Sequence, residues 1–297
     1  MIPLPIASRS SASGLIALMR PHQWIKNGFV AAPLFFTPSA VSIGSVGAVA
    51  AGVVSFSALA SALYILNDYL DREADRAHPT KRRRPLAAGT VAASSALLLM
   101  AGLAVGGLAS ALLLSPAFAV VAATYTLSSL LYSLRLKHVA IIDVFLIALG
   151  FVLRIEGGAV LIGVEPSAWI TIMTGLLALF LALAKRRDDL VKNLGQDHRR
   201  SLDGYNKPFL DAALMILLGA LLVAYLIYTT DRQVMARLGT DRLFLTAPFV
   251  IAGLLRYLQI ALVEERSGSP TILVLTDRFL ITAVIGWILS FGALIYL

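Results

Sequence analysis

Nine apolar stretches separated by short polar loops dominate this sequence and leave few folds open to it. A helix needs about 20 apolar residues to cross the hydrocarbon core of a bilayer, and most of these stretches are long enough. Backbone in lipid must satisfy its own hydrogen bonds, and the stretches lack the alternation of period two that barrel strands show. The sequence therefore predicts an all-α membrane protein of about nine transmembrane helices. The stretches cover residues 24–36, 41–66, 91–113, 117–131, 139–162, 168–184, 209–228, 244–263 and 279–297.

The N-terminal region shapes the predicted domain organisation. The first stretch is short for a full crossing, so we expect its helix to begin near Leu15 or to be tilted. Residues 1–14 contain two prolines and a serine-rich run and lack the pattern of a signal peptide, so we expect a flexible cytoplasmic tail there. Residues 15–297 are expected to form a single polytopic membrane domain.

Composition narrows the classes of partner. With 58% hydrophobic and 14% charged residues, the chain is too apolar for an ordinary soluble domain. Its basic residues, which give a formal net charge of +8, lie in loops between apolar stretches and are not accompanied by a nucleic-acid-binding motif. We therefore expect anionic lipid headgroups and phosphorylated substrates as partners, and no nucleic acid. The sequence has no cysteine, which excludes disulfides and thiolate metal sites. Any metal must therefore be a hard cation held by oxygen.

Basic residues also predict the orientation in the membrane. If the N-terminus is cytoplasmic, the clusters in residues 72–84 and 185–207 both lie on the cytoplasmic side. The opposite side then keeps only Arg232, Arg237 and Arg242. By the positive-inside rule we expect a multi-pass protein of the cell membrane with its N-terminus inside, its C-terminus outside and its active site facing the cytoplasm.

An acidic motif at the end of the second apolar stretch is the most informative local feature. Asp68, Asp71 and Asp75 have helical spacing that predicts one shared face, with Asn67 at its edge. Like charges at this spacing repel, so a cation is expected between them. Oxygen ligands without sulfur favour Mg²⁺, which binds a few carboxylates and completes its shell with water and substrate phosphate.

A solvated helix end is the alternative interpretation of the same motif. Arg72 and Arg76 would then neutralise the aspartates without any metal. We favour the metal site, because carboxylates at the end of an apolar helix usually line a functional cavity.

A basic loop follows the acids directly. Pro79 and Pro85 stop helix formation, so Lys81 and the three arginines after it are expected on a shaped loop. Anchoring to the cytoplasmic membrane surface would also explain such a run. However, four cations beside three acids are well suited to stabilising a departing diphosphate next to a metal.

Two further polar segments are candidate phosphate contacts. The sixth apolar stretch ends in a charged segment, residues 183–190, where Lys185 continues an apolar stripe and is expected to point into the bundle. Anchoring by long basic side chains is the alternative there. Lys26 and Asn27 lie at a cytoplasmic helix start, where a phosphate contact and an anchoring role with Trp24 are equally supported.

Asp143, Arg154 and Glu156 are charged residues within one predicted membrane span, residues 139–162. Such residues need partners, and Arg154 and Glu156 are two positions apart, so they do not face each other on a helix. Their partners are therefore expected on other helices, which the sequence does not name.

Over nearly its whole length the chain resembles the UbiA-type intramembrane prenyltransferase superfamily. The motifs that carry this resemblance are Asn67-Asp-x-x-Asp71-x-x-x-Asp75 and Lys81 with Arg84-Pro-Leu-x-x-Gly89. Further motifs resemble the branch of decaprenyl-phosphate phosphoribosyltransferases. They are Arg20-Pro-x-Gln-Trp-x-Lys-Asn27, the string from Asp75 to Pro85, and Leu183-Ala-Lys-Arg-Arg187.

The resemblance implies a fold and a reaction. The fold is a nine-helix bundle around a central cavity open to the cytoplasmic side and to lipid. The reaction uses Mg²⁺, takes 5-phosphoribosyl from phosphoribosyl diphosphate to a decaprenyl-type polyprenyl phosphate, and supplies precursors of arabinan-type cell-envelope glycans. The superfamily's second Asp-rich motif is replaced here by Lys185-Arg-Arg-Asp-Asp189. Extra cations at that helix end would compensate the additional 5-phosphate of the donor.

These interpretations define three sets of candidate residues. The catalytic candidates are Asp68, Asp71, Asp75, Lys81 and Arg84, and the metal candidates are Asn67, Asp68, Asp71 and Asp75. The substrate-binding candidates are Lys26, Asn67, Arg76, His78, Arg82, Arg83, Tyr132, Lys185, Arg186, Arg187, Asp189 and Tyr205.

Two other functions stay open at this stage. A prenyltransferase would move an isoprenoid chain from its diphosphate to an aromatic or other small acceptor. A transporter of an anionic lipid or metabolite is less favoured, because transporters carry midplane charges whereas charge here concentrates at one rim. Lipid chain length and oligomeric state, including a homo-oligomer, do not follow from these residues.

Overall fold

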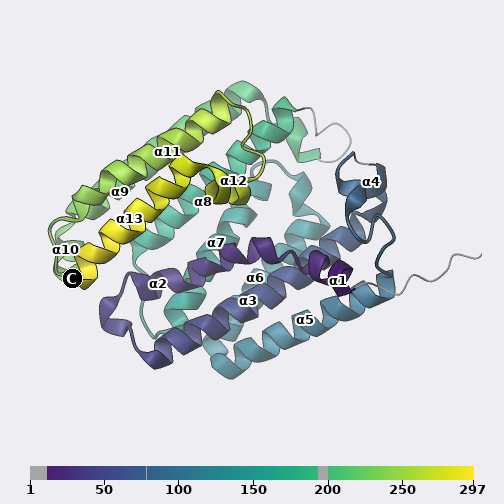
Figure 1. The fold of residues 1–297 in the computed structure, drawn as a ribbon, viewed down its shortest axis with the longest axis horizontal. Helices are drawn as coiled ribbons and strands as arrows, with labels where there is room; N and C mark the ends of the chain where they lie inside the picture. The colour runs from purple at the N-terminus through teal and green to yellow at the C-terminus, as the bar shows by residue number, and fades with distance from the viewer. Residues whose placement is uncertain (1–11, 78, 193–199) are drawn as a thin grey trace, which may run out of the picture.

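The computed structural model describes residues 12–77, 79–192 and 200–297, and every regular element within these ranges is helical. The long helices lie alongside one another, with α4 at one end of the molecule and α10 and the C-terminus at the other (Figure 1). The α-helices are α1 Ala12–Met19, α2 Ala32–Phe35, α3 Ile43–Leu70, α4 Arg72–Ala77, α5 Ala93–Leu114, α6 Pro116–Leu134, α7 Ile142–Leu161, α8 Ala168–Val191, α9 Lys207–Thr230, α10 Arg232–Leu238, α11 Ala247–Leu262, α12 Pro270–Thr276 and α13 Arg278–Tyr296. The 3-10 helices are η1 Pro21–Ala31, η2 Pro38–Ala40, η3 Lys81–Arg83, η4 Leu136–His138, η5 Arg200–Gly204 and η6 Leu243–Thr246.

Eight helices in the described ranges are long and apolar enough to cross a membrane. They are α3, α5, α6, α7, α8, α9, the continuous pair η6 and α11, and α13. The first predicted stretch is instead broken into α1, η1 and α2. Arg20 adopts a left-handed conformation with φ of 52° just before Pro21, so an unbroken helix cannot pass this point. The all-α membrane architecture agrees with the sequence prediction, while the count of nine spans stays a prediction.

Local sequence signals set where several helices begin. Ser42 and Ser45 form a reciprocal capping box at the start of α3. At the start of α9, the Asn206 side chain accepts a hydrogen bond from the Phe209 amide at 2.8 Å. Pro116 occupies the first turn of α6, where a backbone N–H has no partner within the helix, so the N–H that proline lacks costs no hydrogen bond.

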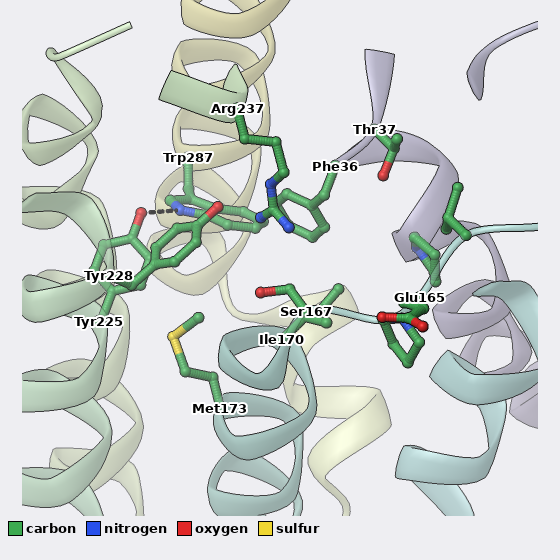
Figure 2. Close-up of a pocket in the computed structure, with 13 residues that line it drawn as sticks. Phe36, Thr37, Glu165, Ser167, Ile170, Met173, Tyr225, Tyr228, Arg237 and Trp287 are labelled. Carbon is green, nitrogen blue, oxygen red and sulfur yellow. Dashed lines mark hydrogen bonds between the residues drawn. The ribbon is translucent and has the colours of Figure 1, made fainter. Parts of the chain in front are cut away.

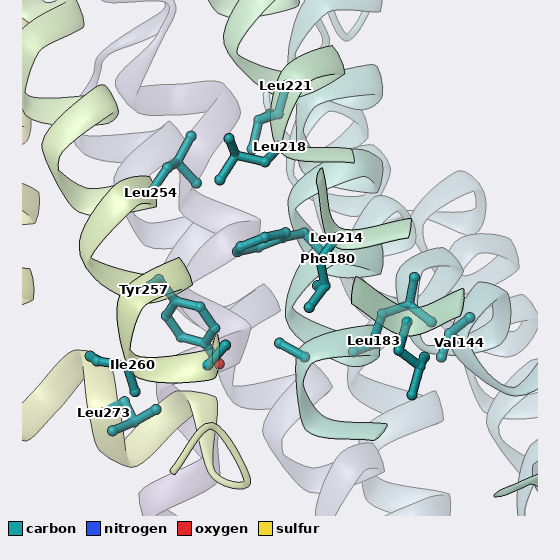
Figure 3. Close-up of a cluster of buried hydrophobic side chains, with 14 of the residues drawn as sticks. Val144, Phe180, Leu183, Leu214, Leu218, Leu221, Leu254, Tyr257, Ile260 and Leu273 are labelled. Atoms are coloured by element: carbon teal, nitrogen blue, oxygen red, sulfur yellow. The ribbon is translucent and has the colours of Figure 1, made fainter. Parts of the chain in front are cut away.

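Two buried apolar clusters hold the bundle together. One cluster joins α3, α5, α6 and α7 around Phe56 and Phe118. The other joins α8, α9 and α11 around Phe180, Leu214 and Tyr257 (Figure 3). Helix α7 packs against both α6 and α8, so it connects the two halves of the bundle.

Close packing at one glycine holds η1 inside the bundle. A Cβ atom at Gly158 of α7 would lie 2.0 Å from the Val30 carbonyl oxygen at the end of η1. Only glycine allows the two backbones to approach this closely. Helix η1 also packs against α3, so Lys26 and Asn27 are carried between α3 and α7.

An ion-pair network at the start of α13 supports a stability prediction. Asp277 caps α13 and pairs with Arg256 at 2.8 Å and with Arg266 at 3.2 Å. Hydrogen bonding from Arg256 lowers the pKa of Asp277 to about 2. Because this folded pKa lies below the unfolded value, the stabilisation is full above about pH 4 and is lost as the pH falls through about 2.

Replacing Asp277 by asparagine is expected to destabilise the protein by about 1–2 kcal/mol at pH 7 and by less at pH 3. Thermal unfolding of detergent-solubilised protein at the two pH values measures the difference. Asp241→Asn is the matched control, because that carboxylate is 83% exposed. Equal unfolding temperatures for wild type and Asp277→Asn at pH 7 would contradict the prediction.

Candidate active site

The acidic motif lies where α3 gives way to α4, at one end of the molecule (Figure 1). The sequence predicted one shared helical face for the three aspartates, and the structure places a break within this motif. Helix α3 ends at Leu70, and Asp71 has a non-helical conformation with φ of −89° and ψ of 2°. The bonds from the Asp71 amide to the Asn67 carbonyl and from the Asp75 amide to the Asp71 carbonyl continue across the break. The break therefore bends the motif without unravelling it.

Asp68 and Asp75 are brought together by one arginine. Nη1 of Arg84 donates to Asp68 Oδ1 at 3.0 Å and to Asp75 Oδ2 at 2.7 Å. Arg20 donates to the same Asp68 oxygen at 2.5 Å. Both aspartates are nearly inaccessible, at 2% and 3% exposed, so their charges need partners within the protein.

Asp71 has a different environment and is half-buried. Lys137, from the loop between α6 and α7, donates to Asp71 Oδ1 at 2.7 Å. Asn67 donates to the other carboxylate oxygen at 3.0 Å and lies 3.5 Å from the same lysine. The three aspartates thus form a pair around Arg84 and a neighbour held by Lys137.

The contacts differ from the alternative interpretation, in which Arg72 and Arg76 neutralise the aspartates of a solvated helix end. Arg72 and Arg76 contact Glu73, at 3.4 and 2.8 Å, and Arg76 also donates to the Ala87 carbonyl. The buried aspartates pair instead with Arg84 of the following loop and, for Asp68, with the distant Arg20. Arg20 and Lys137 were not among the predicted site residues, although Arg20 begins the motif Arg20-Pro-x-Gln-Trp-x-Lys-Asn27.

The basic loop folds as predicted into a short, shaped segment. Residues 81–83 form the 3-10 helix η3, in which Arg82 and Arg83 are exposed and Lys81 is half-buried. Arg84 follows and reaches the aspartates. His78, a predicted substrate contact, lies outside the described residues.

The second charged helix end contains a deeply buried ion pair. Nε of Arg186 donates to Asp143 Oδ2 at 2.7 Å, and both side chains are at most 1% exposed. The Tyr205 hydroxyl donates to the other oxygen of Asp143 at 2.8 Å and accepts from the Ile141 amide at 2.6 Å. Burial raises the pKa of Tyr205, so this hydroxyl stays protonated as the donor. Arg186 also lies 3.4 Å from Asp189 and 3.5 Å from the Tyr132 hydroxyl.

Arg187 is likewise tied into the protein. It pairs with Asp211 of α9 at 2.5 Å and donates to the Ala261 carbonyl of α11 at 2.7 Å. Lys185 lies on the same helix end and is half-buried. In this conformation Arg186 and Arg187 join helices together, and the predicted substrate contacts there stay untested.

Two of the intramembrane charges now have named partners. Asp143 pairs with Arg186, from another helix as expected. Arg154 donates to Asn27 and to the Tyr125 hydroxyl, both from other helices, and to the Gly150 carbonyl on its own helix.

An aromatic pocket lies near α10, at the end of the molecule opposite α4 (Figure 1), and Figure 2 shows it in close-up. Phe36, Tyr225, Tyr228 and Trp287 line it, and Arg237 of α10 reaches over it. The indole N–H of Trp287 donates to the Tyr225 hydroxyl at 2.7 Å. The central cavity that the family resemblance implies stays a prediction.

The acidic motif suits a hard cation. In the described part of the chain, no three carboxylate or histidine side chains lie close enough together to hold a metal ion. However, one arginine nitrogen reaches both Asp68 and Asp75, so the two carboxylates already converge on a single cationic position. Mg²⁺ is usually held by one or two carboxylates together with substrate phosphates, and this oxygen-only set fits that chemistry.

Comparison with known proteins identifies the family. Residues 28–269 match the model of the UbiA prenyltransferase family. The chain belongs to this family. Its fold is also similar to that of a UbiA homologue from Archaeoglobus fulgidus bound to DMAPP and Mg²⁺, with a TM-score of 0.70 and 22% identity over 95% of this chain and 99% of that one. The predicted UbiA-like helical fold is confirmed.

Curated relatives that match almost the full length include two mycobacterial proteins. A decaprenyl-phosphate phosphoribosyltransferase of Mycolicibacterium smegmatis is 35% identical over 97% of this chain and 94% of its own. The protein of the same name from Mycobacterium tuberculosis is 33% identical over 95% of this chain and 94% of its own. The predicted resemblance to this branch is therefore confirmed, and the individual site residues stay untested.

Proposed function

We propose that this UbiA-family protein transfers 5-phosphoribosyl from phosphoribosyl diphosphate to a polyprenyl phosphate and releases pyrophosphate. The observation that carries the proposal is the near full-length similarity to the two mycobacterial phosphoribosyltransferases. The geometry supports it, because a buried carboxylate pair beside arginines is suited to a metal-bound diphosphate. Arabinan-type glycan precursors of the cell envelope are the proposed use of the product.

The acidic motif is the proposed diphosphate site. Asp68, Asp71 and Asp75 would hold Mg²⁺, with Asn67 supporting Asp71 through its hydrogen bond. Mg²⁺ held by these residues would supply positive charge to the diphosphate oxygens. Arg84 already lies against two of these acids and would contact the leaving pyrophosphate, with Lys81 from the same loop.

The proposed transfer is a displacement at the anomeric carbon of the donor. The bond from C1 of the ribosyl group to the diphosphate oxygen breaks, and C1 bonds to a phosphate oxygen of the lipid. The transition state has oxocarbenium character, as in other glycosyl transfers. Because the lipid phosphate is already anionic, no general base has to remove a proton.

We place the active site on the cytoplasmic side, with the N-terminus inside and the C-terminus outside. The distribution of lysine and arginine between the two ends of the bundle supports this orientation. A water-soluble donor and a membrane-bound acceptor would then meet at the rim of the bundle.

An assay with purified protein tests the proposed function. Phosphoribosyl diphosphate labelled in the sugar, Mg²⁺ and a polyprenyl phosphate are expected to give labelled lipid and pyrophosphate in equal amounts. Omitting the lipid phosphate is expected to abolish pyrophosphate release. Pyrophosphate release without labelled lipid would reject the proposal, and transfer of an isoprenoid from its diphosphate to an aromatic acceptor would favour a prenyltransferase instead.

A further inference from the structure

Arg154 is a buried cation in the membrane whose partners are all neutral. The residue is 5% exposed and lies within the apolar helix α7. Its side chain donates to Asn27 Oδ1 at 2.8 Å, to the Gly150 carbonyl at 2.6 Å and to the Tyr125 hydroxyl at 3.1 Å. Within the described ranges no carboxylate lies at ion-pair distance from it. A guanidinium buried without a counter-ion is costly, and in membranes such residues usually serve function.

A second cation lies on the neighbouring residue of η1. Lys26 is half-buried and directly precedes Asn27, which accepts the hydrogen bond from Arg154. The part of the chain that is described contains no hydrogen bond or ion pair to this ammonium. Arg20 is already paired with Asp68, so the uncompensated charges are Lys26 and Arg154, here called the inner cation pair.

The inner cation pair lies deeper in the bundle than the acidic motif. Along η1, Arg20 contacts Asp68, the Trp24 indole donates to Ser61, and the Asn27 amide donates to Ser57. Helix η1 therefore runs along α3 away from the acids. Ser57 precedes Asp68 by eleven residues, which is about 16 Å along a helix.

Hydrogen bonds preorganise this position for an anion. The Asn27 side chain accepts from Arg154 and donates to Ser57 at 2.9 Å, which fixes the plane of the guanidinium. Tyr125 contributes both its hydroxyl and its ring, whose centre lies 4.7 Å from the guanidinium carbon. Lys26 keeps its three donors for a ligand, and an arginine with a lysine is a common pair for binding phosphate.

We propose that Lys26 and Arg154 form a second anion subsite inside the bundle, which binds a phosphate monoester of a substrate. It is separate from the diphosphate site at Asp68 and Asp75. The inference rests on the proposed function only in naming a phosphate monoester as the anion, because both proposed substrates carry such a group. One is the 5-phosphate of the sugar donor and the other is the phosphate of the lipid acceptor.

Binding measurements with three probes test the subsite. Calorimetric titration of the full-length protein in detergent uses ribose 5-phosphate, farnesyl phosphate and pyrophosphate with Mg²⁺. Lys26→Met is expected to weaken binding of one or both monoesters at least about tenfold, and to leave pyrophosphate binding unchanged. The monoester that is affected identifies the source of the phosphate. Lys207→Met, an exposed lysine at the start of α9, is the matched control.

Thermal unfolding separates this role from a structural one. Because Lys26 is a half-buried cation without a hydrogen bond or ion pair in the described part of the chain, Lys26→Met is expected to be at least as stable as wild type. A lower unfolding temperature together with equal loss of all three probes would overturn the subsite. Unchanged monoester binding in Lys26→Met, or a wild-type protein that binds neither monoester, would also overturn it.

The subsite and the proposed function can fail independently. If no sugar is transferred to lipid but monoester binding depends on Lys26, the subsite stands and the proposed reaction falls. If sugar transfer occurs and monoester binding does not depend on Lys26, only the subsite falls.

Discussion

Asp68→Asn is expected to lower kcat/KM for phosphoribosyl transfer at least about a hundredfold, because a metal-held diphosphate is worth several kcal/mol in the transition state. The substitution removes the charge that faces Arg20 and Arg84 and, by the proposal, a ligand of Mg²⁺. Transfer of labelled sugar to lipid, measured across Mg²⁺ concentrations, gives the effect. The loss is expected to be larger at low Mg²⁺.

Two further variants separate loss of the metal site from loss of the fold. Glu73→Gln makes the same chemical change at an exposed acid of α4 and is expected to retain activity. Asp71→Asn alters a half-buried member of the motif, so its folding is less at risk, and it is expected to lose activity as Asp68→Asn does. Wild-type rates in well-folded Asp68→Asn and Asp71→Asn would remove the basis of the proposed metal site.

Arg186→Met is expected to destabilise the protein by about 3–5 kcal/mol, the usual cost of breaking a buried ion pair. The substitution leaves the 0% exposed carboxylate of Asp143 without its cation, and the donors that remain to it among the described residues are the Tyr205 hydroxyl and the Val144 amide. Thermal unfolding in detergent measures the loss. Removing both charges in Arg186→Met with Asp143→Leu is expected to recover part of it.

The control for this prediction is Arg82→Met, which removes an exposed arginine and is expected to leave stability unchanged. One other outcome would support the substrate-binding role that the sequence predicted for Arg186. If Arg186→Met is as stable as wild type but does not bind substrate, the arginine serves the substrate and not the packing of α8 against α7.

Local patterns in the sequence determined the membrane class, most helix positions and the family. Apolar stretches near the length of a bilayer crossing predict spans because the requirement acts on each segment separately. The acidic motif and the basic loop after it were likewise visible, because Asp68 to Arg84 is one continuous segment. Family membership followed from such motifs, and the comparison confirmed it.

The partners of the charged residues were decided only by the tertiary structure. Arg20 and Lys137 meet the aspartates from segments 48 and 66 residues away along the chain. Arg154 meets Asn27 across 127 residues, and Asp143 meets Arg186 across 43. Charge alone does not say which cation neutralises which acid, because that depends on how helices pack in a medium where every buried charge must be compensated. The sequence by itself determined which chemical groups this protein carries, and only the packing of η1, α3, α7 and α8 decided which of them meet.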